Sequence, residues 1–285
     1  MAQRMLAAPP HDDVFLMSQR TITKKRHRFY RHLFAVTLLL VLMQALPSPI
    51  FRVHLIGGGL LMVLLLIELG HAIASGPFDQ ARIGQASIRN ARLYRLFGLL
   101  GLCSLLIWMF TPASSTYTGL PVLMLLSVFV FWSLQRLVRL LGREQTIGSE
   151  VIAGAVAGYL LLGICGGLLF TVLETLQPGS FQNLVHEGRH LRGHLFVNPD
   201  LNRLIWDLDY SRINYFAFVA LTTTGFGDIV PVTPPAEMAT ISLSIAGSLY
   251  LALVMGLLIS RFTVQTQQEE GVETIQDHAP PQQEP

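Results

Sequence analysis

Six long apolar runs constrain the fold of this chain more than any other feature of its sequence. A helix that crosses a bilayer needs about 20 mostly apolar residues, and each run approaches or exceeds that length. Only 13% of the 285 residues are charged, against about 25% in an average soluble protein. We therefore predict an all-α membrane protein whose six transmembrane helices comprise residues 33–51, 54–75, 96–111, 120–141, 151–176 and 236–262.

The positive residues are distributed unequally between the two sides of the predicted membrane. Of the 20 Lys and Arg residues, 15 fall on the side that also holds both chain ends. Because positive residues accumulate on the cytoplasmic side, we predict a multi-pass protein of the cytoplasmic membrane with both termini in the cytoplasm. The net charge of +2 gives no basic excess, so we expect no nucleic-acid partner.

The apolar pattern divides the chain into four parts. Residues 1–32 form a basic cytoplasmic segment, and residues 33–145 form a four-helix transmembrane unit. Residues 146–262 contain the fifth helix, a long outer loop and the sixth, inner helix at 236–262. Residues 263–285 are rich in Gln, Glu and Pro, and a segment of this composition cannot bury an apolar core. We expect this tail to be disordered.

The outer loop ends in an apolar stretch that is too short to cross a bilayer. A helix over residues 213–222 would reach about 15 Å, roughly half of the hydrocarbon core, so the chain must dip in and return. It returns through the sequence TTGFGD at residues 223–228. Non-helical backbone at that depth is tolerated only where protein shields it or where it lines a watery path. We predict an outer segment at 177–212, the turret, followed by a re-entrant helix at 213–222 and a returning strand that is either shielded by protein or lines a watery path.

The run LTTTGFGDIVP in this loop resembles the selectivity filter of potassium channels, whose usual form is T-V-G-Y-G-D. In such a filter, successive carbonyl oxygens replace the hydration shell of K⁺, and glycines supply left-handed dihedral angles. One strand makes one wall of the pore, so the resemblance implies a homotetramer with K⁺ as the permeant ion. The implied ion-binding residues, which act through carbonyl oxygens and the Thr223 hydroxyl, are Thr223, Thr224, Gly225, Phe226 and Gly227.

The wider resemblance is to bacterial six-helix ion channels without a regulatory domain, and it covers roughly the C-terminal half of the chain. It implies that Asp228 braces the outer mouth and that Glu174 braces the filter from behind. An exposed carboxylate at the end of a helix is the alternative for Glu174. Tyr215 is expected to support the filter, and with Trp206 and Tyr210 to form an aromatic cuff at the membrane interface.

The sixth run carries glycines where the inner helices of potassium channels have a hinge. Gly247 and Gly256 are the two candidates for this gating hinge, and close packing against a neighbouring helix is an equal alternative. In the fifth run, the pattern Gly154-x-x-x-Gly158 predicts a packing face. The sixth run also has hydroxyl side chains, at least one of which should face a watery cavity, at Ser242, Ser244 and Ser248.

The fourth run lacks the charge pattern of a voltage sensor. Its arginines, Arg136, Arg139 and Arg143, all lie at one end, where anchoring at the cytoplasmic surface explains them. Glu68 is the only acidic residue deep within the first four runs. A buried ionisable residue usually has a partner, so we predict that Glu68 pairs with Arg136 or Arg139. A proton- or voltage-responsive switch is the alternative.

The turret contains the pattern H-E-x-x-H, which in zinc proteases places two histidines on one helix face. Here Gly188 weakens the helix, and Phe196 stands where the longer version needs a third histidine. We therefore do not expect an enzyme. His186, His190 and His194 recur every four residues, so a helix would present them together as a weak metal or pH site, with ordinary surface histidines as the alternative.

These features favour a potassium-selective channel that conducts passively, with little voltage dependence and no cofactor beyond the permeant ion. Phe226 replaces the usual Tyr and removes its hydroxyl, so a weakly selective cation channel is the first alternative. A metal-binding receptor built on the turret histidines is an alternative of a different class.

Overall fold

The computed structural model is almost entirely helical. It describes residues 11–44, 58–67, 85–110, 116–144, 147–184 and 210–277. The helices are α1 (His11–Met43), an unlabelled helix (Gly58–Ile67), α3 (Gln85–Phe110), α4 (Thr116–Leu141), α5 (Ser149–Leu176), α6 (Tyr210–Leu221), α7 (Pro234–Leu249), the π-helix η3 (Tyr250–Met255) and α8 (Gly256–Asp277). Two short antiparallel strands, β1 (Phe181–Asn183) and β2 (Ile229–Pro231), complete the fold.

Within the described residues, three helical stretches are long and apolar enough to cross a membrane. These are Leu120–Leu141, Ser149–Leu176 and the continuous inner helix Pro234–Gln268, which joins α7, η3 and α8. A mostly helical, multi-pass membrane protein is therefore confirmed at this level. The prediction of six spanning helices stays a prediction, since the second apolar run is described only over Gly58–Ile67.

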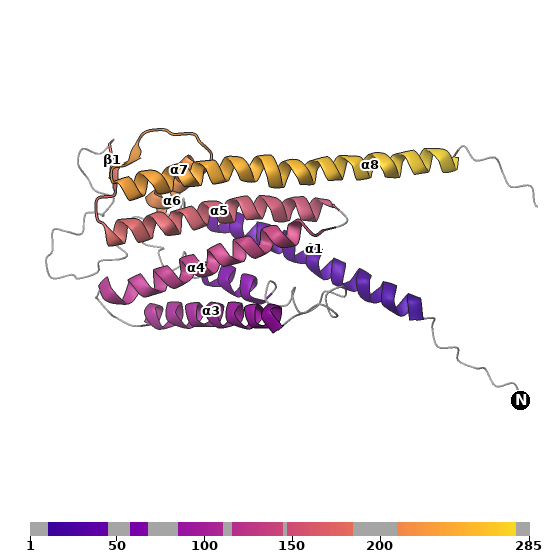
Figure 1. The fold of residues 1–285 in the computed structure, drawn as a ribbon, viewed down its shortest axis with the longest axis horizontal. Helices are drawn as coiled ribbons and strands as arrows, with labels where there is room; N and C mark the ends of the chain where they lie inside the picture. Colours follow the sequence, from indigo (N-terminus) through magenta and orange to yellow (C-terminus); the bar gives the residue numbers. More distant parts are fainter. Residues whose placement is uncertain are drawn as a thin grey trace, which may run out of the picture.

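Helix α5 is the central element of the bundle. Figure 1 shows it between α1 and α4 on one side and the long inner helix on the other. Of its apolar stretch, 61% is buried, against 22% for the inner helix. Its buried side chains join one continuous core with residues of α1, α4 and the helix Gly58–Ile67, among them Tyr30, Met62, Phe129 and Leu161. The inner helix thus leaves much of its apolar surface uncovered within one chain.

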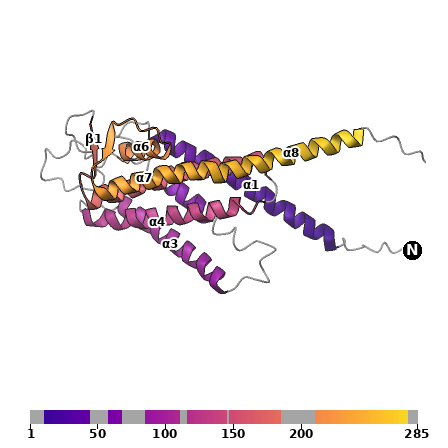
Figure 2. The same ribbon diagram turned by 45° about the horizontal axis from the view of Figure 1, so that its top comes forward.

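The molecule has two distinct ends. The pore helix α6 and strand β1 lie together at one end, whereas the start of α1 and the end of α8 both project beyond the bundle at the other (Figures 1 and 2). Helices α1 and α5 run in the same direction: Tyr30 of α1 fills the space beside Gly154 near the start of α5, and Gln44, just after α1, bonds Asn214, which lies beside Gly167 further along α5. The segment that resembles a filter is therefore remote from the two terminal helix ends.

Two predicted boundaries are corrected by the structure. Helix α8 continues to Asp277, so disorder from residue 263 was a wrong prediction over the first part of the tail. The physical reason is cooperativity: extending a helix that the bundle already holds avoids the cost of nucleation, so a polar stretch can continue it. Helix α1 likewise begins at His11, well before its apolar run.

Arg136 is buried rather than exposed at the membrane surface. Its guanidinium lies 4.0 Å from the centroid of the Tyr94 ring and 5.9 Å from that of Trp132, and it donates a hydrogen bond to the Asn90 carbonyl. Arg136 thus ties α4 to α3 through its cation–π contact with Tyr94, whereas anchoring at the cytoplasmic surface stays a prediction. Glu68, its predicted partner, lies outside the described residues.

Candidate functional site

Helix α6, the predicted pore helix, is held by an aromatic cluster at the C-terminal end of α5. Phe170 of α5 lies 5.0 Å from Phe181 of β1 and 5.6 Å from Phe216 of α6, measured between ring centroids. Phe181 and Phe216 are 5.5 Å apart. These three rings close a separate core with Ile213 and Leu221. Aromatic rings at such spacings bury large areas and favour tilted geometry, so they fix α6 against α5 and β1.

Three glycines allow neighbouring helices to approach α6 closely. A Cβ on Gly163 would collide with the Phe218 ring, and one on Gly167 would collide with the Asn214 side chain. On the inner helix, a Cβ on Gly247 would collide with the Leu221 carbonyl oxygen. Sequence reasoning missed the first two, although the pattern Gly163-x-x-x-Gly167 is the same small-residue signal that was noted for Gly154 and Gly158.

The last turn of α6 is held by both flanking helices and leads directly into the filter segment, residues 222–228. Ser244 of α7 donates a hydrogen bond of 2.8 Å to the Ala220 carbonyl, and the Tyr159 hydroxyl of α5 donates to the Leu221 carbonyl at 3.4 Å. The backbone N–H groups of residues 222, 223 and 224 donate to carbonyls of the same turn. The position of α6 therefore sets where the filter segment begins.

The backbone of the filter segment alternates in handedness. Thr223, Gly225 and Gly227 have positive φ angles of 57°, 59° and 77°, whereas Thr224 and Phe226 between them do not. An alternation of right- and left-handed residues directs successive N–H groups to one side and therefore the carbonyl groups to the other. All residues from 222 to 227 are exposed in the single chain. The sign of φ thus alternates over five consecutive residues, and Thr223 takes a positive φ without being glycine.

Tyr215, Phe226 and Asp228 meet at the outer end of the filter segment. The rings of Tyr215 and Phe226 are parallel within 2°, with centroids 6.5 Å apart, and the Tyr215 hydroxyl interacts with the Asp228 carboxylate. The Asp228 carbonyl accepts a hydrogen bond of 2.8 Å from the Leu184 N–H, just beyond β1. The structure thus brings together Tyr215 and Asp228, two of the three residues predicted to support the filter, and places Phe226 beside Tyr215.

Glu174 is fully buried near the end of α5, so the alternative of an exposed helix-end carboxylate is wrong. Its Oε1 accepts a hydrogen bond of 2.8 Å from the Gly179 N–H, and its Oε2 accepts one of 3.0 Å from the Phe181 N–H. Both donors lie in the turn that leads into β1, and β1 pairs with β2 immediately after the filter segment. Glu174 therefore supports the filter segment indirectly: it binds the turn before β1, and β1 pairs with the strand that follows the filter segment.

We predict that Glu174→Gln destabilises the protein by about 2 kcal/mol or more, because a hydrogen bond to a charged group is worth about 1.5–3 kcal/mol. The amide oxygen can accept from one N–H, whereas the amide NH₂ would face the other donor. Thermal unfolding of detergent-purified protein measures the loss. Glu150→Gln on the same helix is the matched control, since its side chain is 38% exposed and surface substitutions change stability by less than about 0.5 kcal/mol. Equal stability of the two variants would contradict the role of Glu174.

The two predicted hinge glycines lie in different surroundings. Gly247 packs against Leu221 at the end of α6, whereas a Cβ on Gly256 would have only the Leu251 carbonyl oxygen within 4 Å, at 3.9 Å. The π-helix Tyr250–Met255 lies between them. Its first residue, Tyr250, donates a hydrogen bond of 2.8 Å to the Ala155 carbonyl of α5 and fills the space beside Gly158. The glycines at 154 and 158 thus accommodate tyrosine rings from two different helices.

The three serines of the inner helix also lie in different surroundings. Ser244 reaches the pore helix, as described above, whereas Ser242 and Ser248 are exposed and donate to carbonyls of their own helix. Only the latter two therefore present their side chains at the surface of the single chain.

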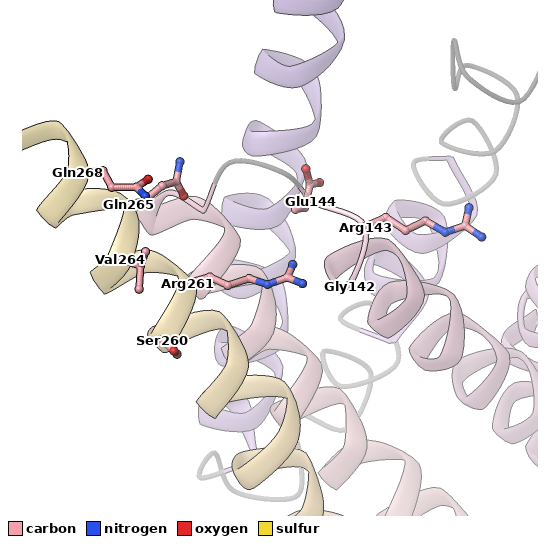
Figure 3. Close-up of a pocket in the computed structure, with 8 residues that line it drawn as sticks. All are labelled: Gly142, Arg143, Glu144, Ser260, Arg261, Val264, Gln265 and Gln268. Atoms are coloured by element: carbon pink, nitrogen blue, oxygen red, sulfur yellow. The ribbon is translucent and has the colours of Figure 1, made fainter. Parts of the chain in front are cut away.

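An open pocket of about 550 Å³ lies far from α6, between the α4–α5 connection and α8 (Figure 3). Arg143 and Glu144 line it from the connection, and Arg261 and Gln265 line it from α8. The Gln265 side chain accepts a hydrogen bond of 2.9 Å from the Ile147 N–H. This pocket therefore marks where the inner helix is attached to the start of α5, and it adds no group to the filter segment.

Several predicted residues lie outside the described residues. These are Trp206 and the turret histidines His186, His190 and His194. Among the residues that the structure does describe, no cluster of His, Cys, Asp or Glu has the arrangement of a metal site. The metal and pH interpretations of the turret stay predictions.

Comparison with known proteins points to the same segment. Residues 193–264 match the family described as Ion channel. A stretch of 46 residues is 41% identical to an uncharacterized protein of Methanothermus fervidus, and it covers 16% of this chain and 7% of that protein. The family match contains α6, the filter segment, α7, η3 and the first part of α8. This segment of the chain, which contains the residues with positive φ described above, therefore matches an ion-channel family.

Proposed function

We propose that the protein is a potassium-selective ion channel, in which K⁺ crosses the membrane passively between the filter segments of a homotetramer. The observation that carries this proposal is the alternation of φ at Thr223, Gly225 and Gly227. A filter must present consecutive carbonyl oxygens on one side in place of the ion's hydration shell. Conduction of this kind needs no cofactor and no enzymatic step.

The exposed filter segment supports assembly into an oligomer. Polar, non-helical backbone at membrane depth must be shielded by protein or line a watery path, and a single chain leaves residues 222–227 uncovered. The inner helix also carries a stripe of exposed apolar side chains spaced three or four residues apart, the pattern by which helices pack side by side. The stripe consists of Met238, Ile241, Ile245, Leu249, Leu253 and Leu257. Four copies around one axis would bury this stripe between inner helices and close the filter.

The proposed topology has six spanning helices, with both termini in the cytoplasm and the filter near the outer surface of a cell membrane. The positive-inside count supports it, as does the projection of α1 and α8 from the end opposite α6. We propose little voltage dependence. Among the described residues of α4, charge is confined to one end, and Arg136 is held there between α3 and α4 by the Tyr94 ring.

Reversal potentials of the purified protein in planar bilayers test the proposal. With opposed K⁺ and Na⁺ gradients, a potassium-selective channel with little voltage dependence gives a reversal potential close to the K⁺ equilibrium potential and an open probability that changes little with holding voltage. A reversal potential near zero would instead indicate a weakly selective cation channel, consistent with Phe226 in place of Tyr. Absence of any current in tetrameric, correctly inserted protein would overturn the channel proposal.

A further inference from the structure

A buried pair of side-chain amides connects the first transmembrane helix to the pore helix. Asn214, in the second turn of α6, is completely buried. Its Nδ2 donates a hydrogen bond of 2.7 Å to Oε1 of Gln44, the residue that follows α1. The backbone N–H of Gln44 donates in turn to the Val41 carbonyl, so the accepting side chain stands on a fixed backbone. The pair joins residues 170 positions apart in sequence.

The second polar atom of each amide is left over by this hydrogen bond. Asn214 Oδ1 and Gln44 Nε2 are buried, and neither has a hydrogen-bond partner among the residues that the structure describes. Burying a polar amide atom without a hydrogen-bond partner lowers the stability of a fold. An aliphatic pair would avoid this cost, so these polar groups are not explained by stability alone.

Helix α1 is suited to act as the fixed point of this contact. Near the start of α5, the Tyr30 ring fills the space beside Gly154, and the Tyr30 hydroxyl donates a hydrogen bond of 2.7 Å to Glu144. Near the outer part of α5, the Asn214 side chain fills the space beside Gly167. The two attachment points are almost equally far apart along both helices, 14 residues from Tyr30 to Gln44 and 13 residues from Gly154 to Gly167. At a rise of about 1.5 Å per residue, α1 and α5 can therefore run side by side between these two points.

The pore helix transmits its position to the filter. Its C-terminal turn receives the N–H groups of residues 222 to 224, so a tilt of α6 about its start displaces the first residues of the filter segment. Gly163 and Gly247 fix the side and the end of α6 through Phe218 and Leu221. Asn214 is the polar attachment near its start, and it is the one that reaches beyond α5 to the first helix.

We propose that Asn214 is a positioning residue for the filter, and that its hydrogen bond to Gln44 is how α1 sets the orientation of the pore helix and thereby ion selectivity. This inference rests on the proposed channel function. It assigns to the first helix a role in permeation that goes beyond packing around the pore.

The test compares Asn214→Leu, Gln44→Leu and the double variant in two measurements, thermal unfolding and the K⁺/Na⁺ permeability ratio. Each single variant leaves one buried amide unpaired, so we expect lower stability and a permeability ratio reduced at least about fivefold, the effect of a shift near 1 kcal/mol. In the double variant both polar groups are replaced, which can be nearly neutral for folding. We therefore expect its stability to recover while its permeability ratio stays low.

Thr37→Val is the matched control. Thr37 is a fully buried polar residue of the same helix, and its hydroxyl donates to the Leu33 carbonyl of α1 itself, so its loss should leave the permeability ratio unchanged. If the permeability ratio recovered in the double variant, the amide pair would matter only for folding, and the inference would be overturned. An unchanged permeability ratio in Gln44→Leu would also overturn the inference, because this substitution lies outside α6 and removes the hydrogen bond without altering the pore helix itself. Wild-type protein that passes no K⁺ would instead overturn the proposed function itself.

Discussion

Replacing Gly225 by Ala is expected to reduce K⁺ conduction at least about 100-fold while the tetramer still assembles. Gly225 has a φ of 59°, and a Cβ there would meet nothing within 4 Å, so the effect arises from backbone conformation and not from a collision. A residue with a Cβ pays about 1–2 kcal/mol in the left-handed region. Because four copies share one pore in the proposed tetramer, this strain is repeated in each copy. Each 1.4 kcal/mol lowers the population of the conducting backbone conformation about tenfold. K⁺ flux into liposomes, normalised to tetramer content, measures the loss.

Gly58→Ala provides the control for this experiment. A Cβ on Gly58 would also meet nothing within 4 Å, and its backbone is not left-handed, so the substitution should leave flux unchanged and stability equal or slightly higher. Gly225→Ala protein that conducts K⁺ as the wild type does would show that residues 222–228 are not the ion pathway.

Gly247→Ala is expected to lower stability strongly, whereas Gly256→Ala should not. A Cβ at position 247 would collide with the Leu221 carbonyl oxygen and lie 2.8 Å from Leu221 Cδ1. The carbonyl belongs to the end of the pore helix and cannot rotate away, so overpacking should cost about 1–3 kcal/mol. At position 256 the nearest atom is 3.9 Å away, and Gly→Ala inside a helix gains about 0.5–1 kcal/mol. Thermal unfolding of both variants in detergent measures the difference.

The same pair of variants separates hinge from packing, which the sequence left as equal alternatives. A stability loss confined to Gly247→Ala supports a packing role at 247. A change in open probability without a stability change in Gly256→Ala would locate the hinge at 256, beside the π-helix, where a poorer hydrogen-bond geometry makes the helix easier to bend. Equal stability of the two variants would contradict the close approach of α7 to Leu221.

The left-handed backbone at residues 225 and 227 was predictable because it depends on local sequence. Glycine favours left-handed dihedral angles, and the spacing of these two glycines is visible in the sequence. Glu174 was also singled out from the sequence, but its hydrogen-bond partners were not foreseeable. They are the N–H groups of a turn, and backbone donors leave no trace in a residue pattern. The strands β1 and β2 were missed for a related reason, since three-residue strands carry too little periodicity to detect.

Residues that act across long sequence distances were the least predictable. Asn214 and Gln44 gave no motif, because a single hydrogen bond between distant helices depends on how those helices pack. Arg136 looked like a surface anchor by its position at the end of an apolar run, yet the Tyr94 ring of α3 covers it. Gly163 and Gly167 carried the expected signal for packing, but their partners on α6 follow only from the re-entrant path of the loop.

The sequence by itself determined that this chain is a membrane protein and which short segment has left-handed backbone at its glycines, because these depend on apolar length and on local dihedral preference. Only the tertiary structure decided how the loop is supported. Glu174 acts through a strand pair, the glycines at 163, 167 and 247 let helices close around α6, and an amide pair ties α6 to the first helix. Such contacts depend on where distant segments meet in space, and this in turn depends on how all the helices of the bundle pack together.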